Sequence, residues 1–399
     1  MNNNFKKNLG ITLIFVVSGL QFFSYFGSVL VTPSLSKLSN GYANLEHNRP
    51  YPVDWVWVTV IGRITGAYIL CTLTLRIGFF KVMRIMIFAY ILIATLVSFY
   101  TFTDTLLYDD IKFMFLQRFL YSFFIPASFM LPALFFLKQR IKNPIMLSAY
   151  ACLSVGLGTF LIFKYLAIRN FYDSWYHMIF YVSVVSGICY FFAENLLSKI
   201  IDYQPSLTPI KLPFNRLVLA SSFGGVCGAT FSYHLAFIHS YVQEVLIGNN
   251  IQSISVAYYY YALLISIIPI AKLVYAKSIF NSLKFSTLSV CLIVIIMANI
   301  NEIGLKVYIA EQLIFGFLTA ILLTPCHALS YQLFKDTQNY FNGMFWFLSF
   351  FTLFTLTPHF FRKLFEIKEY AWLSIVYLLP VSLLFIVALN NYAKEIRVK

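Results

Sequence analysis

Two arginines lie inside long apolar runs of a sequence that contains few charges. Arg63 stands in WVTVIGRITGAYIL and Arg118 in FMFLQRFLYSFF. A guanidinium group is costly to bury unless it has a hydrogen-bonded partner or an anionic ligand. If these arginines face a cavity, they would favour a substrate with a carboxylate or a phosphate, which the planar guanidinium binds bidentately. The alternative is a structural arginine whose side chain extends to the nearest interface.

Polar residues at helical spacing mark one face of the first apolar run. This face is formed by Gln21, Ser24, Tyr25 and Ser28, at positions i, i+3, i+4 and i+7. A similar face in the second half of the chain is formed by Thr230, Tyr233 and His234. Such a face can bind a polar solute, or it can hold neighbouring helices together through hydrogen bonds.

Three side chains in apolar runs could carry a proton. Glu311 could do so or could pair with an arginine, but Lys306 lies about one turn away and could instead hold it at an interface. His234 and His327 could titrate near neutral pH, or each could be a hydrogen-bonded structural histidine. The six cysteines are scattered through apolar runs without the spacing of metal ligands. We therefore expect no metal and no cofactor.

The elements that must position these residues are membrane-spanning helices. The chain has 399 residues, of which 60% are hydrophobic and 11% are charged, whereas soluble domains carry about a quarter charged residues. Apolar windows of about 20 residues recur along it, long enough to cross a bilayer. They predict an all-α integral membrane protein with twelve transmembrane helices, in two bundles of six. The spans are 10–34, 54–75, 82–103, 112–137, 144–167, 174–194, 216–241, 251–276, 280–300, 307–331, 342–365 and 370–392.

The polar stretch 198–215, rich in proline and charge, predicts a link between an N-terminal bundle (1–197) and a C-terminal bundle (216–399). With an even number of spans both termini lie on one side. Lys and Arg number eighteen on that side and nine on the other, which predicts cytoplasmic termini and a cytoplasmic link. This distribution also explains the net charge of +14, so no nucleic-acid partner is expected. The first apolar run is too long for a signal peptide and is expected to be a retained span.

Five segments resemble, in order, motifs of one transporter family. GRITGAYILCTLTLRIGFFKVMR (62–84) is similar to the loop between helices 2 and 3 of the major facilitator superfamily, with Arg63, Gly66, Arg76, Gly78 and Lys81 in register. The other four are GLQFFSYFGSVL (19–30), LQRFLYSFFIPASFMLPALFFLKQR (116–140), SWYHMIFYVSVVSGICYFFAENL (174–196) and ALSYQLFKDTQNYFNGMFWFLSFFTLFTLTPHF (328–360). The chain most resembles the metabolite:proton symporters, which carry proline, betaine and organic acids.

The resemblance implies alternating access of the two bundles around a midplane site. Helices 1, 4, 7 and 10 would be the gates, and glycines would permit close helix approach; these are Gly156, Gly158, Gly224, Gly225 and Gly228. The expected substrate cavity comprises Gln21, Ser24, Tyr25, Ser28, Arg63, Arg118, Thr230, Tyr233, His234 and Gln332. Arg76, Gly78 and Lys81 would form a gating loop, or merely a positively charged membrane anchor. Glu311 and His327 remain as candidates for coupling.

The family's carboxylates are replaced here, which puts proton symport in doubt. The five substituting residues are Gln21, Ser24, Leu75, Ser128 and Gln332. The expected function is transport of a small polar solute, either a zwitterion such as an amino acid or betaine, or an organic acid. The alternative is a non-transporting membrane sensor or binding protein. An enzyme is not expected, because the polar loops 35–53 and 102–110 lack tight ligand spacing.

The expected partners are a small-molecule substrate, a proton if coupling survives, and the lipid bilayer. We expect a monomer in a bacterial-type inner (plasma) membrane.

Overall fold

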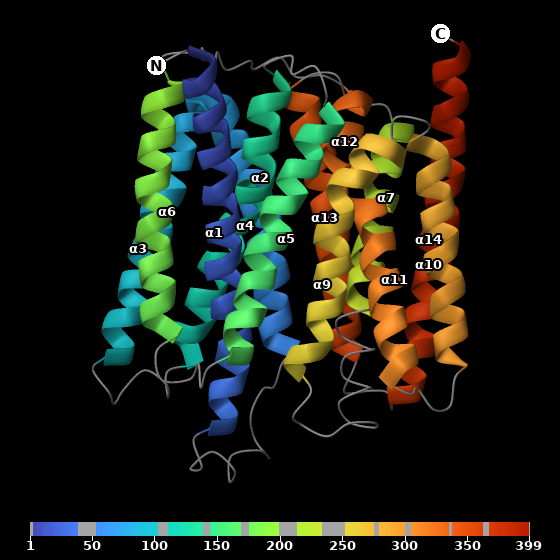
Figure 1. The fold of residues 1–399 in the computed structure, drawn as a ribbon, viewed down its shortest axis with the longest axis horizontal. Coiled ribbons are helices and arrows are strands. Elements are labelled where there is room, and N and C mark those ends of the chain that lie inside the picture. Colours follow the sequence, from blue (N-terminus) through green and yellow to red (C-terminus); the bar gives the residue numbers. More distant parts are fainter. Residues whose placement is uncertain are drawn as a thin grey trace. The chain divides into compact units, whose positions relative to one another are not determined.

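Every element of the structure, a computed structural model, is a helix (Figure 1). It describes residues 3–38, 53–102, 111–138, 144–168, 175–198, 214–233, 252–274, 279–299, 305–334, 337–361 and 367–398. Within these ranges there is no strand, so the all-α prediction is confirmed for this part of the chain.

Helices occupy all twelve predicted spans, as far as those spans are described. The first six are α1 (Asn3–Leu38), α2 (Val53–Ile77), α3 (Phe79–Phe102), α4 (Ile111–Lys138), α5 (Pro144–Ile168) and α6 (Trp175–Leu197). The others are α7 (Phe214–Ser232), α9 (Gln252–Pro269), the π-helix η5 (Ile270–Val274), α10 (Ile279–Ala298), α11 (Leu305–Leu323), α12 (Cys326–Phe334), α13 (Thr337–Phe361) and α14 (Ile367–Val398). Two interruptions were not predicted: η5 follows Pro269, and the tenth span is divided between α11 and α12.

Eight stretches within the described helices are long and apolar enough to cross a membrane. They are Phe5–Tyr25, Trp57–Ile77, Phe79–Ser98, Pro144–Leu161, His177–Leu197, Ile279–Ala298, Lys306–Ser330 and Ile375–Glu395. A shorter apolar helix covers Tyr258–Leu273. These stretches indicate a multi-pass membrane protein. The count of twelve spans stays a prediction.

The surface of α3 shows how such a helix suits lipid. Its exposed side carries large apolar side chains, among them Phe88, which is 59% exposed, and Leu92, which is 60% exposed. Its opposite side buries Tyr90, Ala94 and Val97. A stripe of exposed apolar side chains is unfavourable in water but ordinary in hydrocarbon, where the helix satisfies its own backbone.

The chain divides into two compact units. Unit 1 consists of Met1–Phe136 and Leu157–Leu207, and unit 2 of Leu137–Gly156 and Thr208–Lys399. The division falls inside the predicted link and also inside α5, whose first half groups with unit 2. The domain bounds 1–197, 198–215 and 216–399 therefore stay a prediction.

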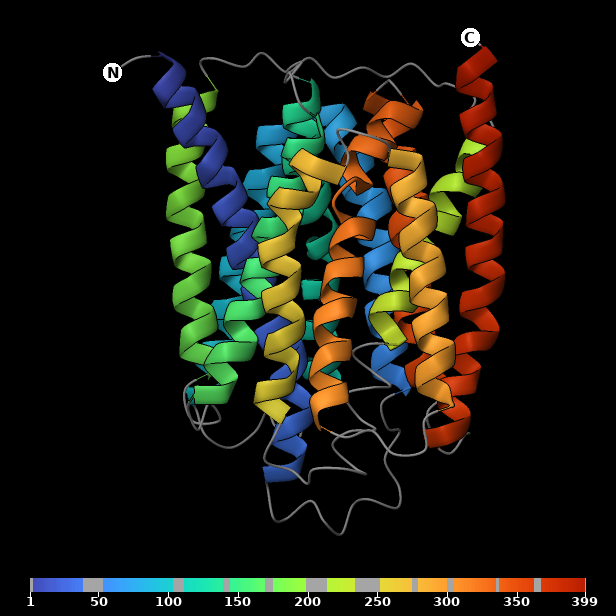
Figure 2. The same ribbon diagram turned by 45° about the vertical axis from the view of Figure 1, so that its right-hand side comes forward.

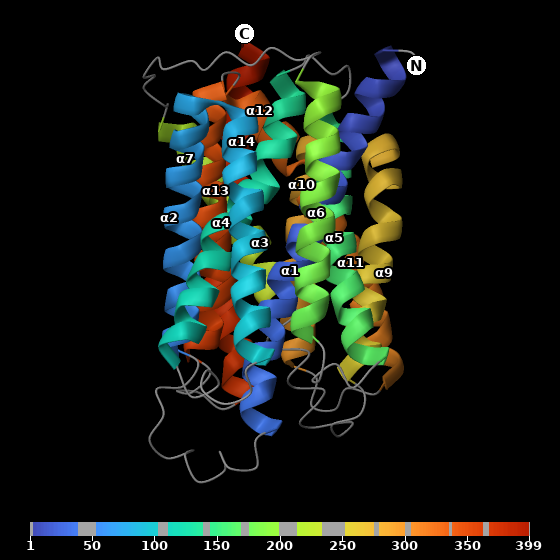
Figure 3. The ribbon, with the colours of Figure 1, turned by 90° about the vertical axis from the view of Figure 1, so that its left-hand side faces the viewer.

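The same pattern of helix pairing occurs inside each unit. In unit 1, α6 packs on α1 and on α3, and close backbone contacts join α2 to α4 and α1 to α5 (Figure 3). In unit 2, α14 packs on α7 and on α10, α9 packs on α11, and α7 packs on α13 (Figure 2). Taken in chain order as six helices each, both units pair their first helix with the fifth and sixth, the second with the fourth, and the third with the sixth.

Glycines make the second-to-fourth pairing of unit 1 unusually close. Gly62 and Gly66 are four residues apart on α2 and face the backbone of Phe119 and Phe123 on α4. A Cβ atom added to Gly66 would lie 2.6 Å from the carbonyl carbon of Phe123 and nearer still to its oxygen. No side chain fits there, so the close approach requires glycine, as in the small-xxx-small motif of packed membrane helices.

Unit 2 has the corresponding contacts. Gly224 and Gly228 of α7 face the backbone of Phe347 and Phe351 on α13, and Gly316 of α11 faces the backbone of Tyr259 on α9. In unit 1, Gly158 of α5 meets the backbone of Gly19 on α1. The prediction of close approach is confirmed at Gly158, Gly224 and Gly228. Gly156 and Gly225 instead meet the side chains of Leu264 and Val381, at 3.1 and 2.6 Å.

Gly78 alone separates α2 from α3. The predicted loop from 76 to 81 is therefore much shorter than expected, since α2 continues to Ile77 and α3 begins at Phe79. Gly78 has a φ of 91°, which L side chains rarely adopt. Its N–H donates to the carbonyl of Thr74 at 3.0 Å and ends α2.

Candidate functional site

Arg63 of α2 extends toward α1 inside unit 1. One of its Nη atoms donates to the phenolic oxygen of Tyr25 at 2.5 Å, and the guanidinium carbon lies 5.2 Å from the centre of that ring. Tyr25 is buried and Arg63 is half-buried. The Nε atom of Arg63 is buried without a hydrogen-bond partner among the described residues. A neutral phenol therefore orients this guanidinium and leaves its positive charge in place.

Arg118 of α4 contacts α2 one helical turn before Arg63. Its Nε donates to Thr59 Oγ1 at 2.9 Å, and Thr59 precedes Arg63 by four residues on the same face of α2. The two guanidinium groups are close enough for their charges to act on each other, and Arg118 also feels the Tyr25 hydroxyl. The structure thus brings together Tyr25, Arg63 and Arg118, which the sequence assigned to a cavity from three separate spans.

The close crossing of α2 and α4 explains this convergence. Gly62 precedes Arg63, and the Phe119 backbone that it faces directly follows Arg118. Since the two backbones meet at this point, the long arginine side chains that flank it must lie side by side. We call Tyr25, Thr59, Arg63 and Arg118 the arginine cluster.

The predicted polar face of α1 divides between two neighbours. Ser24 lies 3.5 Å from Ser183 of α6, measured between the hydroxyl oxygens, whereas Tyr25 turns to Arg63. Gln21 is buried, with 1% of its surface exposed, and neither amide atom has a hydrogen-bond partner among the described residues. It precedes Tyr25 by one turn on the same side of the helix. Its amide is therefore a donor and an acceptor next to the arginine cluster.

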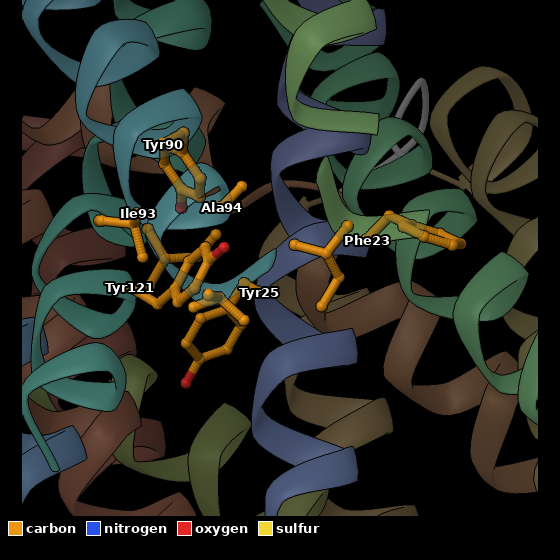
Figure 4. Packing of buried hydrophobic residues seen from close by; sticks show 9 residues of the cluster. Phe23, Tyr25, Tyr90, Ile93, Ala94 and Tyr121 are labelled. Carbon is orange, nitrogen blue, oxygen red and sulfur yellow. The ribbon is translucent and has the colours of Figure 1, made fainter. Parts of the chain in front are cut away.

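Three tyrosines, among them Tyr25 of the arginine cluster, belong to one hydrophobic cluster. Tyr90 of α3 and Tyr121 of α4 are buried, and their ring centres are 5.5 Å apart in an edge-to-face arrangement. Tyr25 belongs to the same hydrophobic cluster (Figure 4). The serine Ser18 adds a tie between α1 and α4, donating from Oγ to the carbonyl of Ser128 at 2.5 Å. These contacts fix α1 against α3 and α4 and so fix the phenol that orients Arg63.

A buried acid, Glu311, lies in unit 2. Glu311 on α11 is 4% exposed, and Gln312 donates from Nε2 to Glu311 Oε2 at 2.9 Å. The hydroxyls of Tyr233 and Tyr259 lie near enough to feel its charge. Tyr233 also packs on Phe315, with ring centres 5.6 Å apart. Glu311 is therefore buried inside the unit, among polar groups of three helices.

The divided tenth span lies close to α5. Thr324 and Pro325 separate α11 from α12, and proline supplies no N–H to continue the helix. In a continuous helix the carbonyl of Leu323 would accept from the N–H of His327. Here it accepts the Cys152 thiol, with sulfur and oxygen 3.2 Å apart. The N–H of His327 donates to Ser148 Oγ at 3.1 Å. Neighbouring side chains thus satisfy the backbone that the break would leave open in hydrocarbon.

Other predicted site residues are less informative. Thr230 is buried and donates to the carbonyl of Val226 in its own helix at 2.8 Å. The imidazole of His327 is buried. His234 lies outside the described residues. So do the side chains of Ser28 and Gln332, although α1 and α12 include their backbones.

The gating-loop residues stand at the junction of α2 and α3. Arg76 and Lys81 are exposed on either side of Gly78. The ion pair here is made by a residue to which no role was assigned: Arg84 donates from Nε to both oxygens of Glu194, at 2.8 and 2.9 Å, and from Nη at 2.6 Å. This fork joins α3 to the last turn of α6. The acid in FFAENL, near the end of a span, was the signal that could have suggested a partner for the basic stretch.

The described side chains contain no cluster of three or more His, Cys, Asp or Glu residues suited to a metal. The arrangement can bind charge: positive groups converge in unit 1, and an acid is buried in unit 2. Comparison with models of known protein families gives no match, and neither does comparison with curated protein sequences.

Proposed function

We propose that the chain is a twelve-helix secondary carrier of the major facilitator type, which moves a small polar solute by alternating access. The observation that carries this proposal is the repeated pairing of helices. Six helices of unit 1 and the corresponding helices of unit 2 meet in the same combinations. Internal repeats with polar sites in their helices are typical of secondary transporters.

Ion pairs near the helix ends support the same comparison. In unit 1, Glu194 at the end of the last helix binds Arg84, and in unit 2, Glu395 at the end of the last helix binds Arg216 at 3.2 Å. Each pair joins the last helix of its unit to an earlier one. The two pairs share their position at the end of the last helix, although the arginine is on the third helix of unit 1 and on the first helix of unit 2.

Polar groups buried inside membrane helices are costly and usually functional. The arginine cluster of unit 1 and Glu311 of unit 2 are the strongest examples here, and we assign solute binding to the first. Glu311, with His327 as the second candidate, would carry a proton if transport is coupled to one. The exposed residues Arg76 and Lys81 would gate access, next to the Gly78 turn.

We place the protein in a bacterial-type inner membrane, with cytoplasmic termini and the 198–215 link on the same side. The distribution of Lys and Arg supports this orientation. The protein would act as a monomer.

A non-transporting sensor or binding protein is the second candidate. The observation in its favour is the lack of carboxylates at the positions of Gln21, Ser24, Leu75, Ser128 and Gln332. Such a protein would bind the solute through the same arginine cluster without moving it. Flux across a membrane separates the two candidates.

The test is uptake into proteoliposomes containing the purified full-length protein. Labelled glycine betaine, L-proline, succinate and phosphate would be offered with and without an imposed pH gradient, against protein-free liposomes. Saturable uptake of a solute supports a carrier, and accumulation that follows the gradient indicates proton coupling. Binding of a solute without flux would overturn the carrier and favour the sensor.

A further inference from the structure

We infer that the arginine cluster is a binding site for a dianion, a small solute with two negative charges such as a dicarboxylate or a phosphate. This inference rests on the proposed function and narrows its solute, since zwitterions and anions were equal expectations. Its basis is the charge of the side chains that converge between α1, α2 and α4.

Among the described side chains of unit 1, positive charge exceeds negative charge at this position. Arg63 and Arg118 bring two guanidinium charges together. In the contacts described, Arg63 donates to the Tyr25 phenol and Arg118 to the Thr59 hydroxyl, both uncharged groups. Among the described side chains of unit 1 the acid is Glu194, which binds Arg84. A phenol and a hydroxyl fix the direction of a guanidinium without neutralising it. The two charges repel each other, and a dianion placed against both would convert that repulsion into attraction.

Hydrogen-bond donors remain for such a ligand. Arg63 Nε is buried and has no partner among the described residues, and the Gln21 amide, one turn from Tyr25, is likewise buried with neither atom bonded. Arg63 and Arg118 are half-buried as whole residues. The planar fork of an arginine binds the paired oxygens of a carboxylate or phosphate.

A zwitterion fits this cluster less well than a dianion. Its carboxylate would neutralise one guanidinium, but its ammonium group would add a third positive charge to the site. Among the polar side chains described in the cluster, none is an anion that could receive this ammonium. We therefore expect selection by charge, with a dianion preferred over a monoanion and a monoanion over a zwitterion.

The experiment measures affinity and flux separately with the purified full-length protein. Affinity is measured from thermal stabilisation in detergent at constant ionic strength, with succinate, inorganic phosphate, acetate, glycine betaine and L-proline as probes. Flux of the same compounds is measured in proteoliposomes. We expect succinate or phosphate to stabilise the protein most. Arg63→Gln or Arg118→Gln should weaken that binding about thirtyfold or more, because each removes one member of a charged hydrogen-bonded contact.

Two variants serve as matched controls. Lys394→Gln removes an exposed positive charge elsewhere and should leave the affinity unchanged, which tests whether the net charge alone attracts anions. Arg63→Lys keeps the charge but loses the fork, so it should bind more weakly than the wild type and more tightly than Arg63→Gln. If the glutamine variants do not fold, the order of probes on the wild-type protein still decides the question.

The outcomes of the inference and of the proposed function are distinct. Transport of betaine or proline, with no binding of dianions, would leave the carrier and overturn the dianion site. Dianion binding that depends on both arginines, without flux, would support the site and overturn the carrier. Equal loss of affinity in Lys394→Gln and Arg63→Gln would overturn the site. Preference for succinate over phosphate, or the reverse, identifies which dianion the site takes.

Discussion

Replacing Gly66 by alanine is expected to separate α2 from α4 and to weaken the arginine cluster. The added Cβ would lie 2.6 Å from the Phe123 carbonyl carbon, whereas ordinary van der Waals contact begins at 3.4 Å. The obstacle is backbone in the middle of a helix, which has no rotamer to change. The two helices must therefore move apart by at least about 0.8 Å, the difference between these distances, and by more at the oxygen.

The expected cost of this displacement is about 1–3 kcal/mol, the usual penalty for overpacking a well-packed interior. The second effect is on binding, because Arg63 is three residues from Gly66 and Arg118 is five residues from Phe123. A shift of about 1 Å in positioned groups can cost about a hundredfold in function. We therefore expect a lower Tm in detergent and a weaker response to dianions.

Gly187→Ala is the matched control. A Cβ on Gly187 would meet Ile91 Cδ1 at 2.8 Å, the flexible end of a side chain that can move aside. Alanine also favours a helix by about 1 kcal/mol over glycine, so Tm should be unchanged or higher. The Tm values of both variants and of the wild type are compared by thermal unfolding. An equal Tm for Gly66→Ala and wild type would refute the close crossing of α2 and α4.

Three further variants or treatments test other contacts. Gly78→Ala should lower the free energy of unfolding by about 1–2 kcal/mol, because its φ of 91° is strained for alanine; denaturation that matches the wild type would contradict this turn. Arg84→Ala should lower the free energy of unfolding by about 1–3 kcal/mol, since it leaves the nearly buried Glu194 carboxylate without its bidentate partner. Adding Glu194→Gln should restore part of this free energy. No recovery in the double variant would mean that loss of the ion pair is not the source of the destabilisation. Cys152 and Cys326, with sulfur atoms 3.8 Å apart, should form a disulfide on treatment with a membrane-permeant thiol oxidant, seen as a linked peptide pair by mass spectrometry after digestion. Failure to link them, while a free-thiol label shows that the oxidant reached other cysteines, would contradict the packing of α5 on α12.

The positions of the helices were predictable, because each membrane span needs about 20 apolar residues and the sequence shows these windows directly. The interruption at Pro325 was not predicted, although proline was visible in the span. A proline can merely kink a membrane helix if its neighbours supply hydrogen bonds. Whether the helix bends or divides depends on groups such as the Cys152 thiol, which the sequence places far from Pro325.

The candidate site was predictable residue by residue but not as an arrangement. Helical spacing put Ser24 and Tyr25 on one face of α1, yet it could not show that Ser24 meets α6 while Tyr25 meets Arg63. Periodicity specifies which residues share a face and leaves the neighbouring helix undetermined. The Arg84–Glu194 pair was missed for the same reason, since its members are 110 residues apart.

The glycine crossings restrict how this protein can change shape. A contact between two backbones contains no rotatable side-chain bond, so it cannot loosen gradually as side chains exchange rotamers. Helices joined in this way, such as α2 with α4 or α7 with α13, must move as one solid piece. Conformational change is then confined to contacts made by long side chains. The glycine contacts determine which helices of each unit form one rigid body.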